Sequence, residues 1–191
     1  MVSDKTIPSL RNMLTLPTIQ AFDAYLAARN LRFEAIIVGG SALALLNVID
    51  RPTRDVDVLA PNLDVATSRA AREFAAEMRA SGNALADEWL NNGPSGLVAV
   101  LPSGWESRLR PVFDGAFLRL NTLGEADLLK SKLFALCDRG TDLGDCMALA
   151  PSADDLASAE VWLAAQDAHP MWPDHVRSTL RDLSRRLKHG L

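Results

Sequence analysis

The sequence predicts an α/β (α+β) fold: a mixed sheet with flanking helices, followed by a C-terminal helical lobe. An apolar, β-branched run over residues 34–38 is typical of a short buried strand and leads directly into Gly39-Gly40-Ser41. A second strand is expected over residues 55–59, where acidic and apolar residues alternate. After residue 121 the apolar residues recur at helical spacing. We therefore expect an α/β core over residues 1–121 and a helical lobe over residues 122–191.

The other elements follow from the same periodicities and from the Gly, Pro and Asn residues between them. In the core, helices are expected over residues 16–30, 41–48 and 63–79, and further strands over residues 84–90, 97–101 and 116–120. In the helical lobe, helices are expected over residues 122–139, 142–149, 152–166 and 173–188. Ser152 and Asp155 form a capping box at the start of the third of these. The basic outer side of the last helix is typical of either an RNA-facing surface or a solvated helix end.

Composition narrows the class of protein. A chain of 191 residues that is 48% hydrophobic can bury a substantial core, and its net charge of −4 argues against general coating of nucleic acid. No run of about 18 apolar residues exists, and no signal peptide follows Met1, so we expect a cytoplasmic protein that does not span a membrane. Cys137 and Cys146 are expected to be buried thiols. The histidines lack metal-ligand neighbours, so a zinc site is not expected.

The acidic strand carries the first candidate site. Because side chains alternate across a strand, Asp55 and Asp57 share one face while Val56 and Val58 face the core. Two carboxylates on one face suit Mg²⁺, a hard ion whose remaining ligands are often substrate phosphates. The alternative is a half-buried strand whose polar face is merely hydrated.

The Gly-Gly-Ser turn supplies the second candidate site. Gly39 and Gly40 allow the backbone to approach a bulky anion closely and to adopt positive φ. Ser41 is expected to begin a helix, whose free N–H groups and dipole favour a phosphate. The alternative is an ordinary strand-to-helix turn in which Ser41 serves only as a cap.

Together these residues resemble the nucleotidyltransferase superfamily that includes DNA polymerase β and the minimal nucleotidyltransferases. The motif is Gly40-Ser41, a spacer, and then Asp55-Val56-Asp57-Val58. The stretch from Arg51 to Arg54 further resembles abortive-infection AbiEii-type toxins and related uncharacterised bacterial proteins. So do Asp127 to Ala135 and then Arg139, Asp142 and Asp145.

The resemblance implies a role for each matching residue. Asp55 and Asp57 would be catalytic and hold Mg²⁺, with Mn²⁺ as an alternative, against a nucleoside triphosphate. Nucleotide-binding roles fall on Gly39, Gly40, Ser41, Arg54, Lys132 and Asp145. Lys132 would be a point charge on the triphosphate. Asp145 would either touch the site or hold Arg139. The alternatives are a solvated lysine and ion pairs near the surface or within the loop.

The superfamily usually supplies a third carboxylate from a later strand. Asp87 is the best placed candidate, with its neighbour Glu88 as the alternative. Asp114 fits less well because it lies in a Phe-Asp-Gly turn, where Asp commonly bonds its own backbone. Without a third carboxylate, the chain could bind a nucleotide without transferring it.

The activity implied is transfer of a nucleoside monophosphate from a nucleoside triphosphate to a hydroxyl of RNA, for example tRNA, or of a protein. Such proteins often act as toxins, which implies an antitoxin partner in a toxin–antitoxin or phage-defence pair. One alternative is a degenerate, non-catalytic module that binds a nucleotide or another protein. A further alternative is nucleotidylation of an aminoglycoside, which would require an acidic acceptor pocket that the middle of the chain does not clearly offer.

Overall fold

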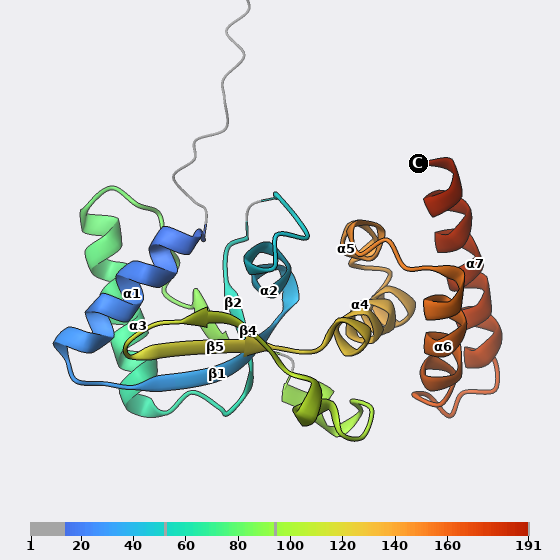
Figure 1. Cartoon of the computed structure of the whole chain (residues 1–191), viewed down its shortest axis with the longest axis horizontal. Helices are drawn as coiled ribbons and strands as arrows, with labels where there is room; N and C mark the ends of the chain where they lie inside the picture. Colours follow the sequence, from blue (N-terminus) through green and yellow to red (C-terminus); the bar gives the residue numbers. More distant parts are fainter. Residues whose placement is uncertain (1–13, 52, 94, 191) are drawn as a thin grey trace, which may run out of the picture.

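The N-terminal half is built on one mixed sheet, whose five strands lie in the order β3-β2-β1-β5-β4 (Figure 1). The computed structural model describes residues 14–51, 53–93 and 95–190. The strands are β1 (Phe33–Val38), β2 (Val56–Ala60), β3 (Leu90–Asn92), β4 (Arg110–Asp114) and β5 (Leu118–Thr122). The pairs β1–β5 and β2–β3 are parallel, whereas β1–β2 and β4–β5 are antiparallel.

This topology brings distant segments together at one edge of the sheet. The last residue of β1, Val38, is paired with Asp57 near the start of β2. Asp57 is in turn paired with Asn91 of β3. On the other side of β1, Ile37 is paired with Thr122, the last residue of β5. The Gly-Gly turn, the acidic strand and the chain entering the helical lobe therefore meet at the same edge.

Two helices cover one face of the sheet. Helices α1 (Leu16–Ala28) and α3 (Val65–Ala80) pack against each other and against the buried strand residues of this face. Phe22 of α1 lies 5.2 Å from Phe74 of α3 and 5.0 Å from Trp89, measured between ring centroids. The indole N–H of Trp89 donates to the Ala71 carbonyl at 3.0 Å, so its polar atom is satisfied in the core.

The opposite face of the sheet carries a smaller apolar cluster that includes Val38, Leu59, Trp105 and Leu128. The chain around this face forms the short helix α2 (Gly39–Leu45) and the 3₁₀ helices η2 (Ser95–Ala99) and η3 (Trp105–Arg108). Leu128 belongs to the first helix of the helical lobe, so this cluster joins the sheet to that lobe.

The helical lobe lies beyond the end of the sheet, at the right of Figure 1. It consists of α4 (Glu125–Arg139), α5 (Leu143–Ala148), α6 (Ala153–Ala164) and α7 (Trp172–His189). These helices share a core of their own, centred on Leu133, Cys146, Leu163 and Val176, each of which is fully buried. No helix in the described part of the chain is long and apolar enough to cross a bilayer.

The mixed α/β fold with a C-terminal helical region is as predicted, and so is the capping box at Ser152 and Asp155. Two local predictions are wrong, and one strand was not predicted. The strand expected over 84–90 begins only at Leu90, and the apolar run 97–101 is mostly the 3₁₀ helix η2, because a short apolar run fits several structures. Strand β4 was not expected. It contains Pro111, which is uncommon within strands but is tolerated here because β4 is an edge strand.

Candidate functional site

A cavity of about 880 Å³ opens where the strand edge meets α4. Its volume lies within the range of about 300–1,000 Å³ that is usual for ligand pockets. The strand edge and the loop before β2 supply one wall, with Val38, Gly39, Gly40, Arg51, Thr53, Arg54, Asp55 and Asp57. The helical lobe supplies Ser131, Lys132, Phe134, Ala135, Arg139, Thr141 and Asp142, and the chain after β3 supplies Gly96, Leu97 and Val100.

Asp55 and Asp57 both face this cavity, as the alternation of the strand predicts. Val56 and Val58 point to the opposite side and are fully buried in the core beneath α1 and α3. The pKa of Asp57 is raised, first by burial and then by the negative charge of Asp55. The Asn91 side chain and the charge of Lys132 act in the opposite direction. The two carboxylates thus form a concentration of negative charge that a cation would relieve.

Glycines surround the Asp57 side chain closely. Gly39 has a φ of +78°, and a Cβ atom there would lie 2.5 Å from Oδ2 of Asp57. A Cβ atom on Gly93 would lie 2.7 Å from Cβ of Asp57. Any larger residue at these positions would displace the carboxylate. The positive φ of Gly39 was predicted, whereas its contact with Asp57 was not. Gly93 was missed because it follows a strand that the sequence placed too early.

Ser41 does not line the cavity, which corrects the expected role of its hydroxyl. Helix α2 begins at Gly39, so its N-cap is Val38 and Ser41 lies within the first turn. The Ser41 side chain is buried, and its Oγ donates to the Val38 carbonyl at 3.3 Å. The hydroxyl is therefore used inside the protein. Gly40 does line the cavity, where a Cβ atom would approach the Thr53 side chain to 3.0 Å.

A buried ion-pair network lies directly beside the acidic pair. The Asp145 side chain is only 1% exposed, and its Oδ1 accepts hydrogen bonds from Nε and Nη2 of Arg51 at 3.2 and 2.6 Å. Nζ of Lys132 lies 2.7 Å from Oδ2 of Asp145 and 3.3 Å from Oδ2 of Asp142. Burial opposes ionisation of Asp145, but its bonds to Lys132 and Arg51 outweigh that effect and lower its pKa.

This network changes the roles expected for its members. Lys132 lines the cavity, but its side chain is 7% exposed and paired with two carboxylates, so it is not a solvated lysine. Asp145 is too buried to touch a ligand and holds Arg51 and Lys132 rather than Arg139. Arg54 and Arg139 both line the cavity. Within the described residues, Arg54 has no ion-pair partner and Arg139 pairs only with its neighbour Asp138, at 3.8 Å.

The candidates for a third carboxylate do not join Asp55 and Asp57. Asp87 is 62% exposed and pairs with Arg79 of α3 at 2.6 Å, and Glu88 lies 3.7 Å from Arg72 of the same helix. Asp114 pairs with Arg119 on the far strand β5. Asp87 and Glu88 turn away because the chain before β3 runs along α3 instead of forming a strand, and Asp114 is distant because β4 is at the other edge of the sheet from β3. The residue paired with Asp57 on β3 is Asn91, an amide.

The chemistry of the donors fits one Mg²⁺ ion. Two carboxylates on the cavity wall match the few protein ligands that Mg²⁺ takes when phosphates and water complete its shell. Among the described residues, no group of three or more His, Cys, Asp or Glu side chains is placed to hold a metal. A metal bound here would therefore take its remaining ligands from a substrate or from water. Asp142, a third acid on the cavity wall, is already paired with Lys132.

Comparison with known proteins assigns the chain to a family. A search of curated proteins and a search of solved structures each gave no match. One family model, described as a nucleotidyltransferase of unknown function (DUF6036), matches residues 15–149. That range includes the sheet, the Gly-Gly turn, Asp55 and Asp57, and the ion-pair network around Asp145. The chain therefore belongs to the DUF6036 family of nucleotidyltransferases of unknown function.

Proposed function

We propose that this protein uses Mg²⁺ and a nucleoside triphosphate to transfer a nucleoside monophosphate to a hydroxyl group. The observation that carries the proposal is the convergence of Asp55, Asp57 and the Gly39-Gly40 turn on one wall of the cavity. Arg54 and Arg139 line the same cavity and provide positive charge, and among the described residues the only ion pair that either forms is that of Arg139 with Asp138. An acidic pair for a metal and nearby arginines for phosphates are the parts that a bound triphosphate requires.

In this proposal, Asp55 and Asp57 hold the metal, and the Gly39-Gly40 backbone allows the phosphates to approach closely. The metal would neutralise charge on the phosphates. Arg54 and Arg139 bind phosphate oxygens, because guanidinium groups suit that geometry. Lys132 adds a positive charge that Asp142 and Asp145 hold in place, so it contributes through its fixed position.

The reaction is attack by an acceptor hydroxyl oxygen on the α-phosphorus. The new oxygen–phosphorus bond forms as the bond to the β-phosphate breaks, and pyrophosphate leaves. The hydroxyl proton must pass to a base. Asp142 is the remaining described carboxylate on the cavity wall, and its negative charge contributes to the raised pKa of Asp57. We therefore assign proton acceptance to Asp142.

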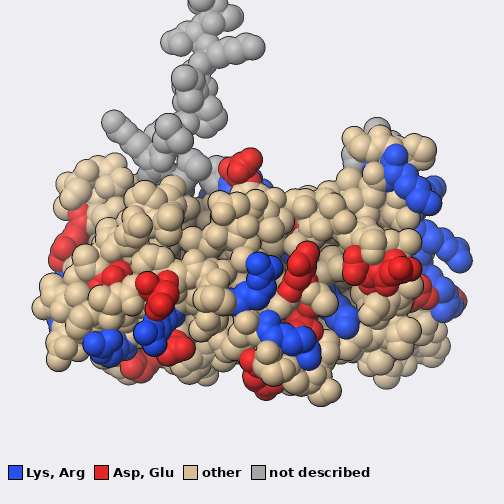
Figure 2. Space-filling view, in the orientation of Figure 1, with Lys and Arg blue, Asp and Glu red and all other residues tan. Residues whose placement is uncertain are grey.

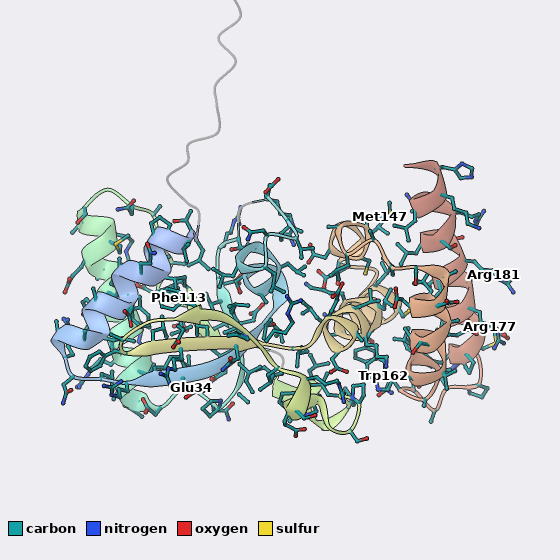
Figure 3. The ribbon with its side chains drawn as sticks, viewed as in Figure 1. Glu34, Phe113, Met147, Trp162, Arg177 and Arg181 are labelled. Carbon is teal, nitrogen blue, oxygen red and sulfur yellow. The ribbon has the colours of Figure 1, made fainter. Side chains whose placement is uncertain are left out.

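One surface feature favours RNA as the acceptor. Helix α7 carries five Arg or Lys residues against two Asp residues, in a chain whose net charge is −4. Figure 2 shows this basic side chain density along the edge formed by α7, and Arg177 and Arg181 point away from the protein in Figure 3. Arg177 and Arg185 form ion pairs with Asp174 and Asp182, whereas Arg181 has no described ion-pair partner. Such a surface suits a phosphate backbone.

The second candidate is a module that binds a nucleotide without transferring it. It is favoured by the position beside Asp57 on β3, which holds Asn91 instead of a carboxylate. An amide can ligate a metal but cannot accept the hydroxyl proton. In that case, binding would be retained and no product would form.

The deciding experiment is label transfer. The purified protein is incubated with Mg²⁺, each of the four α-labelled nucleoside triphosphates, and either total tRNA or no acceptor. We expect label on RNA, or on the protein itself, and a loss of about a hundredfold or more in the Asp57→Ala variant. Nucleotide binding without label would favour the non-catalytic module. If the protein neither binds a nucleotide nor transfers label, both proposals are overturned.

The toxin role and the antitoxin partner rest on the sequence resemblance to AbiEii-type proteins. We propose that the protein arrests growth when it is produced without its partner. Induction of the wild-type gene and of the Asp57→Ala variant, at equal protein levels, tests this. Arrest that depends on Asp57 would support a toxin, whereas equal growth in both strains would remove that role and leave the transfer reaction to be judged separately.

A further inference from the structure

We propose that the apolar end of the cavity binds the nucleobase by shape and stacking, and accepts purines without reading their exocyclic groups. This inference rests on the proposed function, because it assumes that the acidic end of the same cavity binds the triphosphate. It assigns the base to Leu97, Val100, Phe134 and Ala135, which line the cavity together with the acidic pair.

The apolar residues gather at one place because Trp162 of α6 joins the two walls that carry them. The indole N–H of Trp162 donates to the Val100 carbonyl at 3.0 Å. The Trp162 ring packs against Phe134 of α4, with centroids 6.2 Å apart and planes at 71°. Figure 3 shows Trp162 beneath α4, on the side of the segment that follows β3. Phe134 and Val100 therefore share one end of the cavity, and the half-buried Phe134 ring can contact a planar base.

Most polar groups at this end already have partners within the protein. The Leu97 carbonyl accepts from the Val100 N–H at 3.1 Å, and the Val100 carbonyl accepts from Trp162. The Ser131 hydroxyl donates to the Leu128 carbonyl at 2.7 Å, and the Thr141 hydroxyl donates to the Ala135 carbonyl at 3.5 Å. Among the described lining residues there is no Asn, Gln or Glu side chain, and the carboxylates are those of Asp55, Asp57 and Asp142. A base is therefore offered apolar surface and few hydrogen-bonding groups.

The wall that carries Leu97 and Val100 is held in place before any ligand binds. Trp162 ties its middle to α6, as described above. At its far end, Arg108 forms a two-point ion pair with Asp127 of α4, at 2.7 and 3.1 Å, and the Asp127 side chain is 2% exposed. Arg108 also donates to the carbonyls of Ser103 and Pro102. A pre-formed apolar site loses little conformational entropy on binding, so it favours a rigid planar base.

The test measures dissociation constants by calorimetry with Mg²⁺ and a series of ligands, using the wild-type chain. The ligands are ATP, GTP, the triphosphate of unsubstituted purine riboside, CTP, UTP and inorganic tripolyphosphate. We expect ATP, GTP and purine riboside triphosphate to agree within about threefold, since a site built on hydrogen bonds would reject the unsubstituted purine far more strongly. Pyrimidine nucleotides should bind more weakly than ATP. Tripolyphosphate should bind at least about tenfold more weakly than ATP, because it has no base to stack.

Substitutions test which residues contact the base. Phe134→Ala should weaken ATP binding about tenfold and leave tripolyphosphate binding unchanged. Phe113→Ala is the matched control, because Phe113 is also half-buried but lies on β4, outside the cavity. Leu97→Ala repeats the test if Phe134→Ala does not fold.

The outcomes separate the two proposals. If ATP binds no more tightly than tripolyphosphate, the base site is wrong and the triphosphate site remains. If ATP binds more than tenfold more tightly than purine riboside triphosphate, the base is read by hydrogen bonds and the inference is overturned. If no ligand in the series binds, the proposed function fails together with the inference.

Discussion

Asp145 and the pair Asp55 and Asp57 lie close together beside the cavity, but their electrostatic surroundings are opposite. Asp145 accepts bonds from Arg51 and Lys132, and its pKa is lowered. Asp57 is partly buried beside the negative charge of Asp55, and its pKa is raised. Lys132 touches both environments, since it pairs with Asp145 and its charge also acts on Asp57.

The difference leads us to expect that Asp145 stabilises the fold, and that Asp57 is left free for the cation that the proposed function requires. A buried carboxylate with two cationic partners is satisfied by the protein itself. A carboxylate beside another carboxylate is stabilised by a cation or a proton, so its ionised form lowers stability when no cation is bound. Substitutions in the two groups should therefore change stability in opposite directions.

The largest effect is expected for Asp145→Asn, which removes the buried charge that pairs with both Lys132 and Arg51 and leaves Lys132 with Asp142 alone. The free energy of unfolding should fall by about 3 kcal/mol, because removal of one partner strands the other. Urea unfolding at pH 7 measures this. The control is Asp114→Asn, whose pair with Arg119 is exposed and should be worth less than about 1 kcal/mol. Equal losses in the two variants would contradict the distinction between the pairs.

The same pair predicts a pH dependence. Because the pKa of Asp145 is lowered in the folded state, its stabilising contribution is present above the pKa of an unfolded Asp, about 3.9. It is lost as the pH falls below that value and through the folded pKa. The difference in stability between wild type and Asp145→Asn should therefore shrink as the pH decreases below about 4.

The next effect concerns the close approach of Gly39 to Asp57. Gly39→Ala introduces a Cβ atom 2.5 Å from Oδ2 of Asp57 at a φ of +78°. Gly82→Ala is a matched control, since Gly82 has a φ of +88° and nothing within 4 Å of the added atom. The control should lose about 1 kcal/mol from backbone strain, and Gly39→Ala about 1 kcal/mol more from overpacking. If both lose the same, Asp57 moves freely and is not held by the turn.

A smaller effect of opposite sign is expected for Asp57→Asn. Without Mg²⁺ at pH 7, this variant should be more stable than wild type by about 1 kcal/mol, because a repelled charge is removed. Since the folded pKa of Asp57 is raised, the cost of ionising it appears as the pH rises above the unfolded pKa and reaches its full value above the folded one. The advantage of the variant should therefore vanish near pH 3. Thermal unfolding across pH, with and without Mg²⁺, measures this, and a less stable variant at pH 7 would contradict the interpretation.

The sequence predicted the parts of this site that depend on local pattern. Alternation along residues 55–58 placed Asp55 and Asp57 on one face, and the Gly-Gly turn indicated close approach before any partner was known. Which residues pack against that turn depends on strand pairing, which the local sequence pattern does not predict. The pairing of Val38 with Asp57, and of Asp57 with Asn91, comes from sheet topology.

The ion-pair network was missed for the same reason. Arg51 and Asp145 are separated by 94 residues, and only tertiary structure shows that they bond each other instead of their neighbours in sequence. The third carboxylate was sought on a strand whose start was placed too early. Because β3 begins at Leu90, Asp87 lies in a turn beside α3, and Asn91 takes the position next to Asp57.

The smallest effect is expected for Asp87→Asn, which separates the predicted third carboxylate from the observed pair. Asp87 forms an exposed ion pair with Arg79, so the variant should lose less than about 0.5 kcal/mol of stability. Nucleotide affinity and any label transfer should stay at wild-type values, whereas Asp55→Asn should reduce both. Loss of transfer in Asp87→Asn, with binding and stability unchanged, would mean that Asp87 leaves Arg79 and joins Asp55 and Asp57 when the substrate binds. That result would also remove the proton-accepting role assigned to Asp142, because the acid nearest the reaction would then come from the chain before β3.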